Sequence, residues 1–170
     1  MPAYTDIDWS TWQPVERATL LFVIRDGQVL LIHKKRGLGA GKVNGPGGRL
    51  DPGETSAQCA VREVQEEVCA TPTGVRLCGE LKFQFVDGHA IHGLVYRADD
   101  LVGEPRETDE AIPFWCDVHA LPYGQMWMDD RLWLPLMLEG RYFTSRYLFD
   151  GDLMLGCEIQ PVEAPAQAPF

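Results

Sequence analysis

The sequence predicts an α+β domain built from β-hairpins and two helices. Two apolar, β-prone runs at 17–25 and 28–34 flank Asp26-Gly27, a dipeptide typical of a tight hairpin turn. A helical pattern of apolar and acidic residues follows between Gly47 and Ala70. The chain has 170 residues, 45% of them hydrophobic, so we expect one domain with a full hydrophobic core.

The domain is expected at residues 16–160, between an arm and a tail. Residues 1–15 are acidic and aromatic without a clear period, which predicts either a mobile arm or one that packs Trp9 and Trp12 on the body or on a partner. Residues 161–170 are rich in Pro and Ala, and we predict that they are disordered.

A basic and glycine-rich stretch follows the first hairpin. It does not match a P-loop, because Arg36 stands where the first glycine is required and Val43 follows Lys42 in place of Ser or Thr. The dinucleotide-binding fingerprint fails as well, because Asn44 stands where its third glycine is required. We therefore predict a flexible loop with basic residues at its root, and a plain solvated turn is the alternative.

The helix within 47–70 begins with a clear capping signal. Thr55 can accept a backbone N–H bond while Gln58 reaches back, as in a capping box. One face of this helix is apolar and the other is acidic. The apolar face carries Ala57, Ala60, Val61, Val64 and Val68, and the acidic face carries Glu63, Glu66 and Glu67.

Three carboxylates on one strip of a helix repel one another, so we expect a cation to compensate them. Arg62 is one candidate, with Glu54 as its partner at the start of the helix. A hard divalent ion such as Mg²⁺, which prefers oxygen ligands, is the other. A solvated acidic face with ordinary ion pairs is the alternative.

More strands and a second helix are predicted further along the chain. Phe83 and Phe85 alternate onto one face of a strand, as core or as pocket wall. The second helix is apolar almost all round, is stopped by Gly140 and is started or kinked by Pro135. The predicted strands are 75–86, 90–97, 112–118, 141–149 and 153–160, and the predicted second helix is 129–139.

The spacing of the acidic helix resembles the Nudix box. From Gly48 the chain has five residues, Glu54, seven residues and then Arg-Glu-Val-x-Glu-Glu at 62–67. Cys69 and Ala70 depart from the box, which has a glycine and an aliphatic residue there; the ligands are untouched, but the turn after the helix is affected.

Two further segments extend the resemblance to the oxidised-purine nucleoside triphosphate diphosphatases of the Nudix superfamily. These are KKRGLGAGKVNGPGGRL at 34–50 and MWMDDRLWLPLML at 126–138, with Phe83 and Phe85 between them. The similarity covers roughly 17–159. It implies an α/β/α sandwich around a mixed β-sheet. It also implies hydrolysis of 8-oxo-dGTP, and of 2-hydroxy-dATP, to the monophosphate and pyrophosphate, which sanitises the nucleotide pool for DNA repair.

The resemblance also implies a metal site. Mg²⁺, with Mn²⁺ as a substitute, would neutralise the triphosphate and acidify an attacking water. Glu67 or Glu66 would assist the deprotonation of that water, and Glu110 would be an extra ligand or base. The implied catalytic residues are Arg62, Glu63, Glu66 and Glu67, and the implied metal ligands are Gly47, Gly48, Glu63, Glu66, Glu67 and Glu110.

For the base, the resemblance implies a pocket with two adjacent carboxyls. Asp129 and Asp130 can read a purine edge if one is ionised and the other protonated, and Trp127 offers a stacking surface. The alternative is that both only cap the second helix. The implied substrate-binding residues are Thr19, Lys34, Leu38, Asn44, Gly47, Gly48, Phe83, Trp127, Asp129 and Asp130.

Composition limits the kinds of molecule that this protein is expected to bind. A protein with a net charge of −10 is poorly suited to bind duplex nucleic acid, so we expect its substrate to be a small nucleotide. Five cysteines without a CxxC pair indicate a reduced, cytoplasmic protein without structural zinc, and the absence of a long apolar run predicts no membrane segment. We expect a monomer. Because Leu38 and Val43 replace an aromatic residue and a tryptophan of the family, one alternative is another nucleoside diphosphate-linked substrate. The other is a non-catalytic nucleotide-binding module, against which the intact set of Glu63, Glu66 and Glu67 argues.

Overall fold

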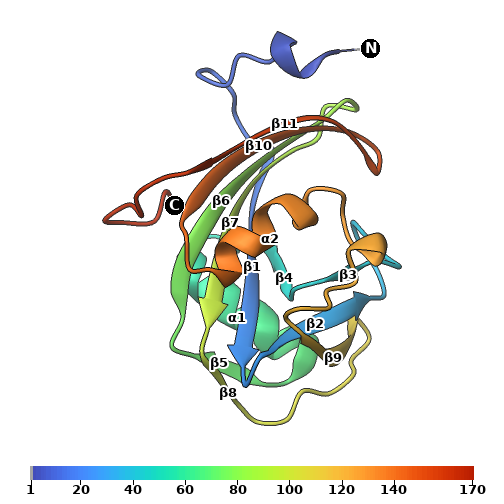
Figure 1. Ribbon diagram of the computed structural model, residues 1–170, viewed down its shortest axis with the longest axis vertical. Helices are drawn as coiled ribbons and strands as arrows, with labels where there is room; N and C mark the ends of the chain where they lie inside the picture. The colour runs from blue at the N-terminus through green and yellow to red at the C-terminus, as the bar shows by residue number, and fades with distance from the viewer. Residues whose placement is uncertain (1) are drawn as a thin grey trace.

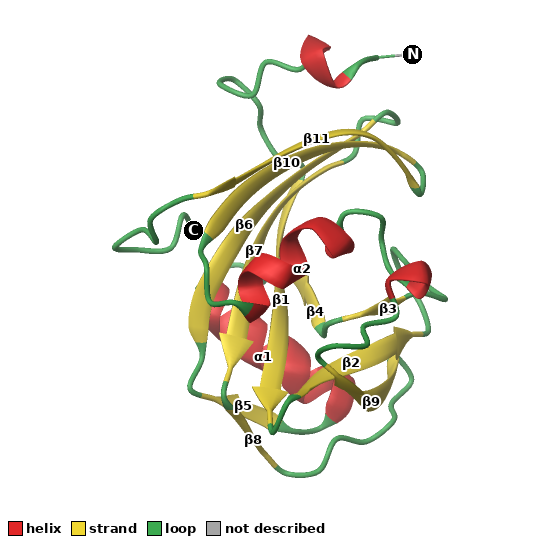
Figure 2. Cartoon of the chain, viewed as in Figure 1, coloured by secondary structure: helices red, strands yellow, loops and turns green. Residues whose placement is uncertain are grey.

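The computed structural model describes residues 2–170 and has a mixed β-sheet at its centre. Helix α1 (Ser56–Val68) covers one face of the sheet, and helix α2 (Asp130–Leu138) covers the other (Figure 1). Figure 2 shows the two helices in red on either side of the yellow strands. The predicted α+β class and sandwich architecture are confirmed.

The main sheet has the strand order β11-β10-β6-β7-β1-β2-β3, with β4 paired to β1 and β9 to β2. The pairs β1–β7 and β6–β10 are parallel, and the other pairs are antiparallel, so the sheet is mixed. The strands are β1 (Glu16–Arg25), β2 (Gln28–Lys34), β3 (Val43–Asn44), β4 (Gly47–Arg49), β6 (Arg76–Phe85), β7 (Ala90–Ala98), β9 (Ala111–Asp117), β10 (Phe143–Asp150) and β11 (Leu153–Pro161).

Short elements complete the fold. Strands β5 (Thr71–Thr73) and β8 (Asp100–Val102) form a separate two-stranded sheet, and η1 (Tyr4–Asp6) and η2 (Tyr123–Gln125) are single turns of 3₁₀ helix. The glycine-rich stretch predicted as loop contains β3 and the start of β4, because both find partners far away in β2 and β1. None of the helices in residues 2–170 is long and apolar enough to cross a lipid bilayer.

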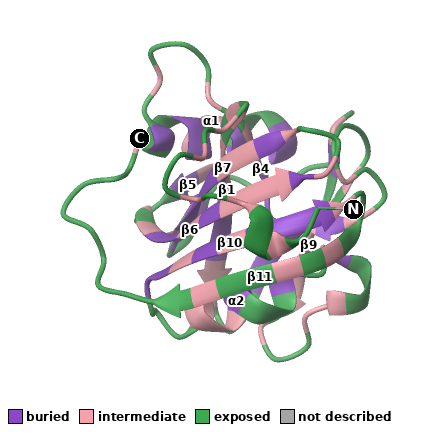
Figure 3. Cartoon of the chain, turned by 90° about the horizontal axis from the view of Figure 1, so that it is seen from above, coloured by how far each residue is buried: buried purple, intermediate pink, exposed green. Residues whose placement is uncertain are grey.

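The core has two halves, one on each face of the sheet. Alternation along β1 sends Leu21 and Val23 toward α1 and Phe22 toward α2. Trp133 of α2 is fully buried on its side and stacks on Phe143 with a centroid distance of 5.6 Å. Figure 3 shows the buried residues in purple in the middle of the molecule and mostly exposed residues in the tail. The two half-cores hold the helices against the sheet. Helix α1 carries Glu63 and Glu67, and Asp130 is the first residue of α2.

Helix α1 begins with a capping box and ends at a residue in the left-handed conformation. The Thr55 hydroxyl accepts from the Gln58 N–H at 3.1 Å, and the Gln58 side chain accepts from the Thr55 N–H at 3.0 Å, which is the predicted capping box. The helix ends at Cys69, which has a left-handed φ of 62° and donates its N–H to the Gln65 carbonyl. Cysteine therefore adopts the geometry that glycine adopts more cheaply, and the turn is kept.

The arm and the tail both touch the body of the domain. The Trp12 indole N–H donates to the Gln84 side chain at 2.9 Å, and the Arg146 guanidinium lies 5.8 Å from the ring centroid of Trp9. The tail has no helix or strand after Pro161, but Phe170 lies edge-on to His92. The mobility suggested for the arm and the disorder predicted for the tail remain predictions.

Candidate active site

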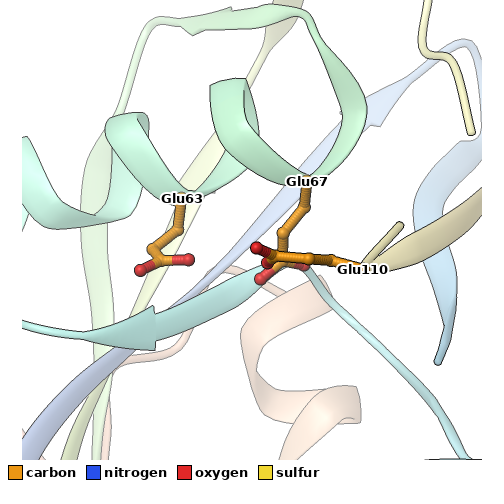
Figure 4. A group of neighbouring side chains, drawn as sticks. All are labelled: Glu63, Glu67 and Glu110. Atoms are coloured by element: carbon orange, nitrogen blue, oxygen red, sulfur yellow. The ribbon is translucent and has the colours of Figure 1, made fainter. Parts of the chain in front are cut away.

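Three carboxyl groups gather between α1 and β9. Glu63 and Glu67 project from α1, and Glu110, the residue before β9, points toward them (Figure 4). One oxygen of each lies within 4.8 Å of the other two. Glu63 and Glu67 are buried, with 9% and 4% of their surface exposed, and Glu110 is half-buried. Carboxylates placed so close together need a cation or a proton.

The pKa values of these groups reflect that need. Burial, and next the Glu63 charge, raise the pKa of Glu67 to about 8. Burial also raises the pKa of Glu63, although its hydrogen bond with Arg62 opposes the shift. The buried Oε2 atom of Glu67 has no hydrogen-bond partner in residues 2–170. An all-oxygen donor set with an orphaned carboxylate oxygen fits a hard divalent cation.

The backbone of β4 closes this site from the other side. A Cβ atom on Gly48 would lie 2.4 Å from the carboxyl carbon of Glu63, so only glycine lets the two approach. The Gly47 N–H points at Glu67 with a distance of 3.4 Å, which is a weak hydrogen bond. The Gly48 carbonyl accepts from the Cys59 thiol at 3.6 Å. The backbone of Gly47 and Gly48 therefore lies within reach of a cation held by the glutamates.

A cavity of about 580 Å³ extends from these carboxylates to α2. All ten residues predicted to bind substrate line it. Glu63, Glu67 and Glu110 line it as well, whereas Arg62, Glu66 and Val43 do not. Leu38 lies at the wall with half of its surface exposed, while Val43 is buried in the core. The exchange of tryptophan for Val43 therefore alters the core and not the cavity wall.

The far end of the cavity holds the two aspartates. Asp129 and Asp130 are 1% and 3% exposed, and the Trp133 indole N–H donates to Asp129 Oδ2 at 2.7 Å. Burial raises the pKa of Asp129, and burial followed by the Asp129 charge raises the pKa of Asp130 further. Asp129 makes no capping hydrogen bond to α2, so the alternative of a simple helix cap is not supported. One oxygen of each carboxyl lacks a partner among residues 2–170.

Aromatic residues frame the aspartates. Trp127 meets Phe149 and Phe85 edge-on, with centroid distances of 5.7 and 6.3 Å, and one part of its ring lines the cavity. Phe83 also lines the cavity and stacks on Tyr147 at 4.9 Å. An aromatic wall beside two buried carboxyls can hold a flat heterocycle and bind its polar edge.

Comparison with known proteins decides the family. The NUDIX domain model matches residues 14–137, which is most of the chain. The chain belongs to the Nudix family. Its helix α1 carries the Nudix box, and the resemblance stated from the sequence is confirmed.

Relatives and solved structures agree with this assignment. The chain is 43% identical to the oxidized purine nucleoside triphosphate hydrolase of Danio rerio over 147 residues, which is 85% of this chain and 94% of that protein. It is 34% identical to the Mus musculus protein of the same name, over 86% of this chain and 95% of the relative. The crystal structure of a mutator MutT protein from Bacillus halodurans matches with a TM-score of 0.77 at 22% identity, covering 88% of this chain and all of that one, and shows a shared fold.

The protein is a Nudix hydrolase, and hydrolases of this family generally use a divalent metal. Within its Nudix box, Arg62 donates hydrogen bonds to several neighbouring groups. Its guanidinium binds both oxygens of Glu54 at 2.6 and 2.9 Å, Glu63 at 2.9 Å and the Arg49 carbonyl at 3.0 Å. The Arg62 hydrogen bond holds the pKa of Glu54 at about 2. Arg62 therefore ties α1 to β4 and orients Glu63, which is a positioning role.

Glu66 of this Nudix hydrolase does not join the cluster of Glu63, Glu67 and Glu110 and does not line the cavity. Half of its side chain is exposed, and it pairs with Arg62 at 3.1 Å. The side chain that joins Glu63 and Glu67 is Glu110, which also pairs with Arg36 at 3.0 Å. Helical spacing placed the three box glutamates on one strip, but it does not fix their rotamers.

Several cavity residues were missed by sequence reasoning. Trp133 stands four residues after Asp129, a spacing at which helical side chains meet, so this signal was available. Glu16 alternates with Ala18 and Leu20 along β1, and all three line the cavity. His89 lines it beside Glu16, with 2.9 Å between the imidazole and the carboxylate. That pairing depends on strand register across the sheet and gave no signal in the sequence.

Proposed function

We propose that this Nudix hydrolase cleaves oxidised purine nucleoside triphosphates such as 8-oxo-dGTP to the monophosphate and pyrophosphate. The main support is the buried pair Asp129 and Asp130. This pair shares one cavity with the acidic cluster of Glu63, Glu67 and Glu110. The names of the Danio rerio and Mus musculus relatives support the same substrate class.

At the end of the cavity that holds Asp129 and Asp130, the protonation states of these two carboxyls would select the purine base. Burial and the neighbouring charge raise the pKa of Asp130 more than that of Asp129, so Asp130 keeps a proton and Asp129 is the first to ionise. A protonated Asp130 donates to a ring carbonyl, and an ionised Asp129 accepts from a ring N–H. Trp127 supplies the surface for stacking. Exchange of the proton between the two carboxyls would admit a second base, such as that of 2-hydroxy-dATP.

The other end would carry out the hydrolysis. We infer that Mg²⁺, with Mn²⁺ as a substitute, is held by Glu63, Glu67 and Glu110 together with the Gly47 or Gly48 carbonyl. When bound, the ion neutralises phosphate oxygens and acidifies water. Lys34 lines the cavity and lowers the pKa of Glu67, so its ammonium lies where phosphate oxygens would be attracted. Glu67 Oε2, which has no protein partner among the described residues, is the atom suited to accept a proton from water.

The protein is further proposed to act on free nucleotides as a cytoplasmic monomer, through a domain at residues 16–160. The acidic surface, with a net charge of −10, disfavours duplex nucleic acid as a substrate.

Pyrophosphate release from purified protein tests the proposal. We expect turnover of 8-oxo-dGTP far faster than turnover of dGTP in the presence of Mg²⁺, and no turnover of either with a chelator. Equal rates for the two nucleotides would refute the substrate assignment.

A second candidate is a nucleoside diphosphate linked to another group. It is favoured by the polar residues Glu16, Arg49 and His89, which also line the cavity and offer partners for a further moiety. A panel of such substrates, compared with 8-oxo-dGTP at equal concentration, distinguishes the two by their kcat/KM values. A non-catalytic role would require the panel to show no turnover at all.

A further inference from the structure

Trp127 is held from outside the cavity by a charged pair. The Lys42 ammonium lies over its ring at 5.2 Å from the centroid, and the same ammonium pairs with Asp152 at 3.2 Å. Trp127 lines the cavity, but Lys42 and Asp152 do not. The cation therefore contacts the indole without lining the cavity itself.

The contact joins three segments that are far apart in the sequence. Lys42 belongs to the glycine-rich stretch before β3, Trp127 precedes α2, and Asp152 is in the turn between β10 and β11. The start of β11, just after that turn, makes a second contact with the Trp127 segment, because the Met154 N–H donates to the Met128 sulfur at 3.3 Å. The Lys42 side chain is only 24% exposed. These contacts limit where the indole can move.

Gly39 completes the enclosure. Its φ is +81°, and a Cβ atom there would lie 2.9 Å from the indole nitrogen of Trp127. The backbone of the glycine-rich stretch thus rests directly on the ring, which brings Lys42, three residues later, over the same indole. A residue with a side chain at position 39 would displace either the ring or the loop.

We propose that Lys42, anchored by Asp152, is a positioning residue for the purine base. This inference rests on the proposed function and assigns a new role next to its base site. An ammonium over one face of an indole attracts π-electron density toward that face. The face toward the cavity becomes less negative, and it stacks better on an electron-rich purine. Lys42 would therefore act on the base through Trp127 without touching it.

The test compares Lys42→Gln and Lys42→Arg with the wild-type protein. Two quantities are measured: the Kd of 8-oxo-dGMP without metal, and kcat and KM for 8-oxo-dGTP with Mg²⁺. For Lys42→Gln we expect Kd and KM to rise about two- to fivefold, the range expected for loss of one cation–π contact, while kcat is unchanged. Lys42→Arg, which keeps a cation over the ring, should retain both values.

The chain offers a matched control in Lys82. Its ammonium lies over another indole, that of Trp12, at 5.8 Å, on the arm and away from the cavity lining. Lys82→Gln removes the same charge and the same type of contact, and it should leave Kd and KM as they are. Asp152→Asn should weaken binding in the same direction as Lys42→Gln but less, and the double variant should be no weaker than Lys42→Gln alone.

Four results would overturn the proposal: unchanged Kd in Lys42→Gln, an equal loss in Lys82→Gln, no retention of affinity in Lys42→Arg, or a fall in kcat at constant KM. Product binding without metal separates this proposal from the proposed function. A wild-type protein that binds 8-oxo-dGMP but does not cleave 8-oxo-dGTP refutes the hydrolase assignment, while the Kd values of the variants still decide the role of Lys42.

Discussion

At one end of the cavity, Glu63, Glu67 and Glu110 converge from separate segments, whereas at the other end Asp129 and Asp130 are neighbours in the chain. Both groups are acidic and largely buried, and burial is the main cause of the raised pKa values at both ends. The surroundings differ. Arg62 and Lys34 lie beside the glutamates. Among residues 2–170, the only side-chain hydrogen bond that another residue type donates to Asp129 or Asp130 comes from the neutral Trp133.

This difference shows two ways to keep carboxyl groups buried. The glutamates face cations and offer free oxygens, so a metal ion can balance their charge. Among residues 2–170, no cationic side chain is paired with Asp129 or Asp130, so a proton must balance their charge. The same functional group, a carboxyl, is thereby suited to metal chemistry at one end and to hydrogen-bond donation at the other.

Replacing Glu67 by Gln should have the largest effect. The amide keeps the shape of the side chain but loses both the charge and the basic oxygen, so we expect kcat for 8-oxo-dGTP to fall by about 10²- to 10⁴-fold. Binding of 8-oxo-dGMP without metal should be unaffected, because the base end is untouched. Glu66→Gln is the matched control: it lies one residue earlier, faces Arg62 and should lose much less. An equal loss in both variants would contradict the assignment.

Replacing Asp129 and Asp130 by Asn, one at a time, should distinguish the roles of the two carboxyls. Asp130→Asn keeps a neutral donor, so it should raise KM for 8-oxo-dGTP only modestly. Asp129→Asn removes the charged acceptor and leaves only a neutral amide oxygen to accept from Trp133, and a lost charge-assisted hydrogen bond to the base corresponds to a rise of about 10- to 100-fold. Steady-state kinetics of both variants decide this. A larger effect of Asp130→Asn would mean that the proton resides on Asp129.

Metal-free stability should depend on pH through Glu67. Its pKa rises from 4.5 to about 8 in the folded protein, so between these values the folded state holds a proton that the unfolded state has released. The stabilisation is complete below about pH 4.5 and is lost as the pH rises through about 8, a change on the order of a few kcal/mol in the free energy of unfolding.

Urea unfolding between pH 5 and pH 8 measures this slope. Added Mg²⁺ should abolish it, because the ion takes the place of the proton, and Glu67→Gln should flatten it as well. A slope that is the same in the wild-type protein and in Glu67→Gln would assign the proton uptake to another group.

The smallest effect is expected at the end of the carboxylate helix. Cys69 holds a left-handed φ of 62°, which glycine adopts without strain, so Cys69→Gly should stabilise the protein by about 1 kcal/mol. For a chain of this size that corresponds to a Tm increase of roughly 2–4 °C, measurable by calorimetry. The kcat should not change, because the Cys69 side chain is exposed and does not line the cavity. A lower Tm would mean that the thiol makes a contact worth more than the strain.

Local patterns predicted much of this fold. The capping box of Thr55 and Gln58, the hairpin at Asp26-Gly27 and the apolar second helix all depend on short-range spacing, and all are present. The short strands β3, β5 and β8 escaped prediction, because two or three residues form a strand only where a distant partner offers its edge. Sequence patterns carry little information about such partners.

For the site, the sequence identified the residues better than their geometry. The ten predicted substrate-binding residues share one cavity because the family motifs fix them together. The direction of Glu66 toward Arg62 is a rotamer choice among competing charges, which spacing alone does not determine. The enclosure of Trp127 by Lys42 and Asp152 depends on a turn more than a hundred residues away from Lys42, and only the folded chain brings them together.

Carboxyl ¹³C NMR on Mg²⁺ addition at neutral pH tests the central contrast most directly, with Glu67→Gln and Asp130→Asn used to assign the signals. The account predicts that the Glu67 carboxyl changes from the protonated to the ionised shift as Mg²⁺ binds, while the Asp130 carboxyl keeps its proton throughout. An Asp130 signal that is ionised without metal, or a Glu67 signal that does not respond to Mg²⁺, would contradict it.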